Sequence, residues 1–169
     1  MEFAMKSSVS IESVVSVMDA TPPPRIELRR VSYNARLSQE TPAFAADVWI
    51  DGVKCGEARN EGTGGPHHIW PPDLRRRLDE HARTLPPLPP MYGMKDPLPM
   101  DAELLIGEIL ELHLAGKDLQ RALRTKYLLV GADGRLYQCS KKGPKPKEPV
   151  LNDMPFEQAL VLYAKAGAR

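Results

Sequence analysis

The sequence predicts an α+β fold, in which an antiparallel sheet of about five strands, built from hairpins, packs with three to four helices. Two dipeptides, Asp51-Gly52 and Asp133-Gly134, lie between runs of strand-forming residues, which is typical of tight hairpin turns. The helical patterns come in separate blocks instead of following each strand. This order favours an antiparallel sheet over parallel βαβ units.

The first 24 residues differ in composition from the rest of the chain. Five serines alternate there with small apolar residues, and the three prolines of residues 22–24 close the segment. These prolines make the end of the segment rigid and prevent a helix from continuing through it. Because 169 residues is about the length of one domain, we expect a flexible N-terminal arm over residues 1–24 and a single α+β domain over residues 25–169.

The strands of the first half are predicted from apolar alternation. A change of parity between Leu28 and Val31 predicts a bulge in the first strand. Residues 44–50 alternate apolar and polar side chains, and the turn after them leads into a return strand over residues 53–59. Gly56 in the return strand predicts a point where a neighbouring segment approaches closely.

Proline and glycine mark the expected helix boundaries. Pro71 and Pro72 fit the first turn of a helix with an apolar stripe at helical spacing. Asp101 is the predicted N-cap of a second helix, which we expect to end at Gly116 and to be followed by a separate short helix over residues 117–124. A hairpin and a last helix complete the chain.

Composition excludes several classes of protein. The chain has 23 Lys and Arg residues and 22 Asp and Glu residues, and this balance argues against a protein that coats nucleic acid. No apolar run approaches the ~18 residues of a membrane helix, and no signal peptide is evident, so we expect a cytoplasmic protein without membrane contact. Cys55 and Cys139 form no CxxC motif, which argues against a zinc knuckle.

Short segments between about residues 30 and 165 resemble an uncharacterised family of small proteins from bacteriophages, prophages and plasmids. The segments that carry the likeness in a shared order are FAADVWIDG at 44–52, NEGTGG at 60–65, MDAELLI at 100–106 and LNDMPFEQAL at 151–160. The resemblance implies a cytosolic accessory protein of a mobile element. It also implies action by binding a host macromolecule, for example to inhibit a host defence complex such as a CRISPR-type system. It supplies no catalytic residues.

The glycine-rich loop at Gly62–His68 is the most specific local motif. Its backbone N–H groups could bind phosphate, which leaves an enzyme acting on a phosphorylated ligand as one alternative. The loop lacks the Lys-Ser/Thr ending of a P-loop, and a turn with positive-φ glycines is the simpler interpretation. The histidines show no metal-ligand spacing, and no nucleophile has a catalytic signature. We therefore predict no metal site, no cofactor and no catalytic residue.

Two binding surfaces are predicted instead. Tryptophan and tyrosine are enriched at protein contact surfaces. The candidates for contact with a protein partner are Trp49, His67, His68, Trp70 and Tyr92. A nucleic acid is the alternative partner, bound by the basic region 125–149 through its lysines, with only Tyr137 near enough to stack on bases. These candidates are Lys141, Lys142, Lys145 and Lys147.

Overall fold

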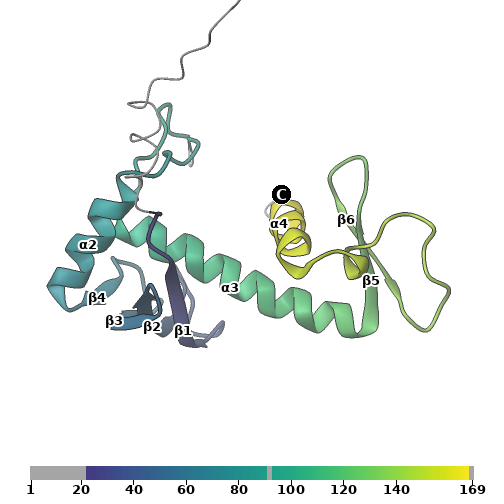
Figure 1. Cartoon of the computed structure of the whole chain (residues 1–169), viewed down its shortest axis with the longest axis horizontal. Helices are drawn as coiled ribbons and strands as arrows, with labels where there is room; N and C mark the ends of the chain where they lie inside the picture. The colour runs from purple at the N-terminus through teal and green to yellow at the C-terminus, as the bar shows by residue number, and fades with distance from the viewer. Residues whose placement is uncertain (1–21, 91–92, 168–169) are drawn as a thin grey trace, which may run out of the picture.

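The computed structural model describes residues 22–90 and 93–167, so residues 1–21 of the expected arm lie outside it (Figure 1). In chain order the elements are β1 (Ile26–Tyr33), β2 (Phe44–Ile50), β3 (Val53–Asn60), β4 (His68–Trp70), α2 (Pro72–Ala82), α3 (Ala102–Thr125), β5 (Lys126–Val130), β6 (Leu136–Ser140), the 3-10 helix η1 (Leu151–Asp153) and α4 (Phe156–Gly167). The predicted α+β class is confirmed. The strands, however, are divided between a four-stranded sheet, ordered β1-β2-β3-β4, and a two-stranded β5-β6 sheet.

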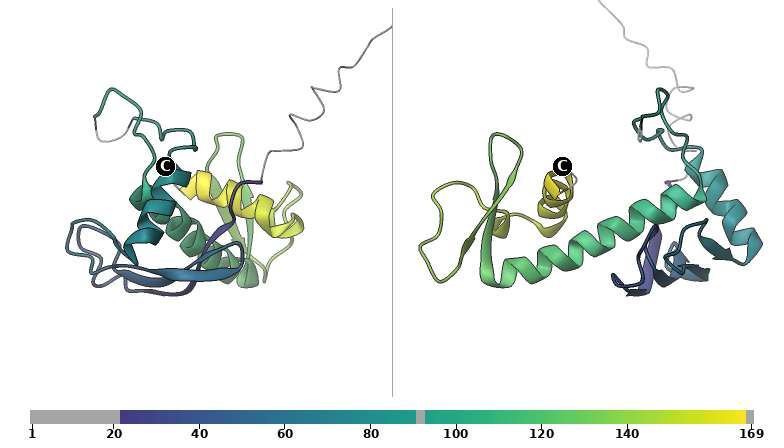
Figure 2. Two further views of the ribbon diagram at one scale, coloured as in Figure 1. Left: turned by 60° about the vertical axis from the view of Figure 1, so that its left-hand side comes forward. Right: turned by 180° about the vertical axis from the view of Figure 1, so that it is seen from behind.

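The 24-residue helix α3 connects the two sheets. At 1.5 Å per residue it is about 36 Å long. The four-stranded sheet lies on one side of its N-terminal half, and α4 lies on the opposite side of its C-terminal half (Figures 1 and 2). Buried apolar residues form two clusters accordingly. One contains the inner face of the four-stranded sheet with α2 and Leu105, Ile106 and Leu110 of α3, and the other centres on Leu119 and Leu128.

The hairpin of β2 and β3 follows the predicted alternation. Phe44, Ala46 and Val48 point into the core, and the connecting turn has positive φ at both Asp51 (51°) and Gly52 (80°). The predicted bulge in β1 is confirmed, because the register with β2 shifts between Arg29 and Ser32. The residues that alternate with these core positions form the opposite, outward face of the four-stranded sheet.

Gly56 is the point of close approach that the sequence predicts. A Cβ atom at this position would lie 2.1 Å from the backbone oxygen of Trp70 and 2.7 Å from Cδ2 of Leu74. Only glycine leaves room for the end of β4 and the start of α2 to cross β3 so closely. The absence of a side chain at Gly56 thus fixes where α2 sits on the sheet.

The predicted break at Gly116 is wrong, because α3 continues to Thr125. Gly116 is buried where α4 crosses α3, and a Cβ atom there would already contact Cδ2 of Leu160 at 3.7 Å and Cζ of Phe156 at 3.8 Å. Packing of α4 against the helix outweighs the ~1 kcal/mol that an interior glycine costs. The predicted N-cap is confirmed, since the Asp101 side chain accepts a hydrogen bond from the Leu104 N–H at 2.8 Å.

Asn152 in η1 fixes the β5-β6 hairpin to the end of α3. Its Oδ1 accepts a hydrogen bond from the Leu128 N–H at 3.0 Å, and its Nδ2 donates to the Lys126 carbonyl at 3.0 Å. The same Nδ2 donates to the Leu123 carbonyl at 3.5 Å. One amide thus satisfies backbone groups on both sides of the point where helix becomes strand.

Candidate functional site

Three of the predicted partner-binding residues gather on the outward face of the four-stranded sheet. Trp49 pairs with Glu27, Trp70 with Glu57 and His68 with Arg59 in the strand register, and the side chains at these positions point away from the core. Trp70 is 56% exposed, whereas Trp49 is half-buried. Tyr92 lies outside the described residues.

Trp49 is covered by a neighbour on its own face. The guanidinium carbon of Arg29 lies 4.1 Å from the centre of the indole ring, a cation–π contact, and Glu27 holds Arg29 through a hydrogen bond of 2.7 Å. The indole Nε1 is buried and has no hydrogen-bond partner in the part of the chain that the structure describes. Trp70 therefore offers the more accessible aromatic surface.

A buried carboxylate on this face is held by ion pairs. Asp47 is buried and pairs with both Arg30 and Lys54, the latter at 2.8 Å. The hydrogen bond from Lys54, followed by that from Arg30, lowers the pKa of Asp47 against the opposing effect of burial. The carboxylate thus stays ionised between two cations.

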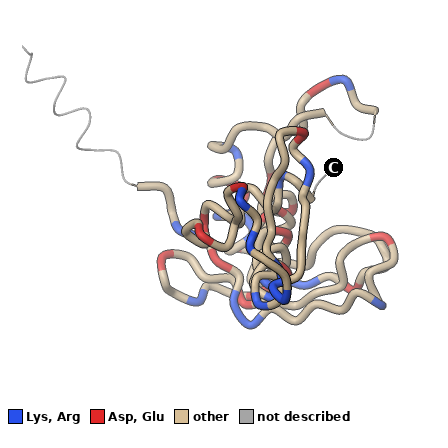
Figure 3. The backbone as a smooth tube through the Cα atoms, turned by 90° about the vertical axis from the view of Figure 1, so that its right-hand side faces the viewer, with Lys and Arg blue, Asp and Glu red and all other residues tan. Residues whose placement is uncertain are grey.

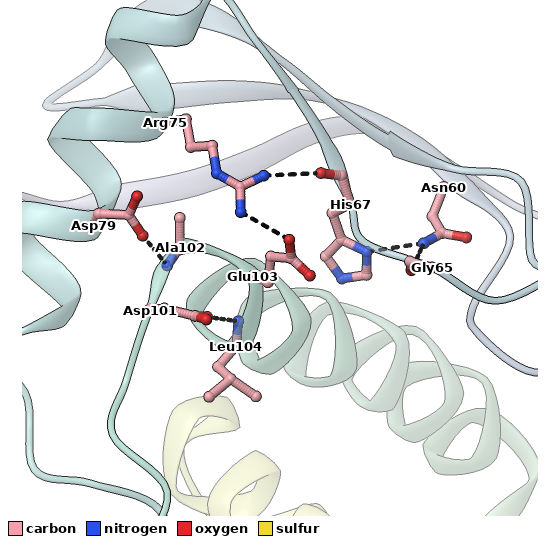
Figure 4. Close-up of polar contacts among 9 residues, drawn as sticks. All are labelled: Asn60, Gly65, His67, Arg75, Asp79, Asp101, Ala102, Glu103 and Leu104. Atoms are coloured by element: carbon pink, nitrogen blue, oxygen red, sulfur yellow. Dashed lines mark hydrogen bonds and ion pairs between the residues drawn. The ribbon is translucent and has the colours of Figure 1, made fainter.

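His67 points into the molecule, toward α3 (Figure 4), whereas His68 is exposed. Its Nδ1 lies 3.1 Å from Nδ2 of Asn60, and its ring packs edge-on against Phe44 with 5.1 Å between centroids. Arg75 donates to the His67 carbonyl at 3.4 Å and to Glu103 at 2.8 Å. This histidine ties the glycine-rich loop to α2 and α3, so the two adjacent histidines have separate environments.

The glycine-rich loop is closed by its own hydrogen bonds. Asn60 accepts from the Gly62 N–H at 2.8 Å and donates to the Gly65 carbonyl at 3.1 Å, while the Gly64 N–H donates to Oγ1 of Thr41 at 3.3 Å. All three glycines have positive φ. The turn interpretation therefore accounts for the glycines, and the N–H groups of Gly62 and Gly64 are engaged within the chain.

His67 should make folding stability depend on pH. Burial holds the pKa of His67 below its ordinary value, although Glu103 opposes the shift. Below about pH 6.5 the unfolded chain binds a proton more readily than the folded one, so the free energy of unfolding falls as pH drops. We expect His67→Gln, which keeps an acceptor for Asn60 but does not titrate, to show a smaller decrease between pH 7 and pH 5 in chemical denaturation. A decrease equal to that of wild type would contradict this role, and His68→Gln on the exposed face is the matched control.

The opposite end of the molecule carries the strongest charge. Residues 117–149 contain nine Lys and Arg residues and three Asp and Glu residues, whereas residues 22–116 contain eleven and fourteen. We call this end, formed by the last turns of α3, the β5-β6 hairpin and the loop after it, the basic pole. The balanced composition of the whole chain conceals this segregation.

The fold brings separate basic segments of the pole to one place. Lys126 is paired with Ser140 across the hairpin, and the Lys141 N–H donates to the Thr125 carbonyl at 3.0 Å. Lys141 and Lys142 therefore lie beside Arg124 in the last turn of α3. Seen from this end, Lys and Arg positions gather at the lower middle of the molecule, where α3 meets the hairpin (Figure 3).

Most of these cations are not neutralised. Three of the nine have acidic partners: Arg121 pairs with Asp118 at 3.3 Å, Arg135 with Asp133 at 3.8 Å and Lys145 with Asp153 at 2.6 Å. Within residues 22–90 and 93–167 the other six have no acidic partner within 4.0 Å. These six are Lys117, Arg124, Lys126, Lys141, Lys142 and Lys147.

The hairpin adds two tyrosines to the pole. Leu128 is buried, so the alternating residues Tyr127 and Leu129 point to the outer face, where Tyr137 pairs with Leu129. Tyr137 is 47% exposed, and Nζ of Lys141 lies 5.6 Å from the centre of the Tyr127 ring. Sequence reasoning named only Tyr137, although alternation around the buried Leu128 places Tyr127 on the same face.

Comparison with protein-family models, with curated proteins and with solved structures found no match. The likeness to a family from mobile elements stays a prediction. Among the described side chains, His, Cys, Asp and Glu form no group of three or more that could hold a metal ion. No helix in the same part of the chain combines the length and the apolar character needed to cross a membrane.

Proposed function

We propose that this protein binds nucleic acid through its basic pole. The observation that supports the proposal most directly is that the pole with six unneutralised cations also presents Tyr127 and Tyr137 on one face of its hairpin. Cations bind phosphates and release condensed counterions, and aromatic rings stack on unpaired bases. The combination fits a single-stranded nucleic acid, whose bases are free to stack.

A purely structural role explains only part of this charge. Cations in the last turn of a helix interact favourably with its dipole, which accounts for Arg124 on α3. That effect falls off within one turn, so it does not account for Lys117, which lies eight residues before the end of α3. It also does not explain why Lys141 and Lys142 lie beside a helix end that already carries Arg124. A ligand with several negative charges is the simplest reason to hold these lysines there.

A protein partner on the outward face of the four-stranded sheet is a second candidate. The observation in its favour is Trp70, a large aromatic side chain 56% exposed beside His68 on the same strand. Tryptophan is enriched among residues that dominate binding energy at protein interfaces. An inhibitory contact with a host complex, as the resemblance implies, would use this face and leave the basic pole free.

Fluorescence anisotropy with labelled 20-nucleotide DNA and RNA, single-stranded and duplex, tests the first proposal. We expect saturable binding at ~50 mM salt, tighter for single strands than for duplexes. Equal affinity for single strands and duplexes would support phosphate contact but contradict stacking of bases on the tyrosines. No binding to any of the four probes at low salt would contradict the proposal.

Tyr137→Ala should weaken single-strand binding by about fivefold to a hundredfold, the range that loss of one base–aromatic stack produces. Tyr137 is exposed, so the hairpin should tolerate the change, although the hydrogen bond from its hydroxyl to Asp133 at 2.8 Å is lost. Tyr33→Ala is a matched control because Tyr33 is also exposed, at 42%, but lies on β1 far from the pole in the fold. A similar loss in both variants would speak against stacking at the hairpin.

A further inference from the structure

The loop between α2 and α3 contains a segment with an unusual pattern of burial. Leu85 and Leu88 are half-buried and pack against the larger apolar cluster. The two prolines between them, Pro86 and Pro87, are exposed, as are Pro89 and Pro90. The two half-buried residues thus lie three positions apart with exposed prolines on both sides of Leu88, and the loop projects away from both sheets (Figure 1).

A period of three is that of the polyproline II helix, which has three residues per turn. Proline fixes its own φ near −65° and disfavours the α region for the residue before it. In the run from Leu85 to Pro90, every residue is a proline or is followed by one. The sequence therefore favours polyproline II. Of the three edges of such a helix, the one with Leu85 and Leu88 faces the protein, and the two that carry the prolines face outward.

The body of the protein holds this segment in place. Leu88 exchanges two backbone hydrogen bonds with Leu98, each 2.9 Å long. At the start of the segment the Leu85 N–H donates to the Ala82 carbonyl at 3.0 Å, which anchors it to the end of α2. A ligand held in its bound conformation loses little entropy on binding.

We propose that residues 86–90 are a ligand for a protein domain that recognises polyproline II helices in a groove lined by aromatic side chains. Such grooves read exposed prolines spaced three apart, a pattern that Pro86 and Pro89 present and that Pro87 and Pro90 repeat. Arg83, the exposed C-cap of α2, lies just before this segment and has no acidic partner within 4.0 Å in the described chain. The partner's groove should therefore carry a carboxylate at the end that receives Arg83.

The experiment uses the full chain and a panel of isolated SH3 and WW domains, both of which read such ligands. Each ¹⁵N-labelled domain is titrated with the unlabelled chain to millimolar concentration, and the amide shifts are followed. We expect at least one domain to shift at the aromatic residues of its groove. Pro86→Ala with Pro89→Ala should reduce that affinity by about thirtyfold, as truncation of a contact residue that dominates binding does.

Two further variants make the result specific. Pro97→Ala with Pro99→Ala removes two exposed prolines from the other side of the same loop and should leave binding unchanged. Arg83→Gln should weaken binding to domains with an acidic groove only. The proposal is wrong if no domain of the panel shifts, or if the two double variants bind equally well. Circular dichroism confirms folding of each variant, and unchanged binding of the oligonucleotide separates this surface from the basic pole.

Discussion

Neutralising three cations of the basic pole should weaken binding to a single-stranded oligonucleotide by roughly a thousandfold at ~50 mM salt. The variant is Arg124→Gln, Lys142→Gln and Lys147→Gln, three exposed residues without acidic partners among those described. Each cation that contacts a phosphate contributes about tenfold at this salt concentration through counterion release. Anisotropy titration of wild type and variant measures the difference.

The matched control neutralises three cations at the other end of the molecule. Arg36, Arg59 and Lys95 are exposed and likewise have no acidic partner within the described ranges. Their replacement by glutamine changes the net charge equally, so it tests whether charge alone or its place in the fold matters. Equal losses in the two triple variants would show that binding is not localised at the basic pole.

Gly56→Ala should destabilise the fold by more than about 3 kcal/mol, a large part of the 5–15 kcal/mol typical of a domain. The new Cβ atom would lie 2.1 Å from the Trp70 carbonyl oxygen, and a backbone atom cannot move aside as a flexible side chain can. Either β4 and α2 separate from β3, or the hairpin distorts. Urea denaturation should show a lower midpoint with an unchanged slope.

Gly143→Ala is the control for this substitution. The nearest atom to a Cβ there, the Ser140 carbonyl oxygen, is 3.7 Å away, which is ordinary van der Waals contact. We expect its free energy of unfolding to stay within about 0.5 kcal/mol of wild type. If Gly56→Ala were as stable as this control, α2 would not pack across β3 as described.

Features that depend on the conformational preference of one or two residues were predicted from the sequence. The Asp51-Gly52 turn, the bulge in β1, the N-cap at Asp101 and the glycine at the crossing of β3 each follow from the conformational preference of one or two residues. The α+β class followed from the order of these elements.

Features that depend on tertiary packing were beyond sequence reasoning. Glycine at position 116 predicted a helix end because its helix propensity is low, whereas in the fold Gly116 is buried against α4 and α3 continues past it. The three-residue strand β4 is too short to show alternation. The sequence predicted only part of the basic pole. The lysines of residues 141–147 are evident as a basic run, but their position beside Arg124 depends on the pairing of β5 with β6.

The salt dependence of binding tests the central claim most directly. The affinity of wild type for a single-stranded 20-mer is measured from 50 to 300 mM salt and plotted as log K against log salt concentration. If the six unneutralised cations contact phosphates, the slope should be about −4, and the triple neutralisation at Arg124, Lys142 and Lys147 should make it less steep by about 2. A flat plot, or a slope that the triple variant leaves unchanged, would contradict nucleic-acid binding by the basic pole.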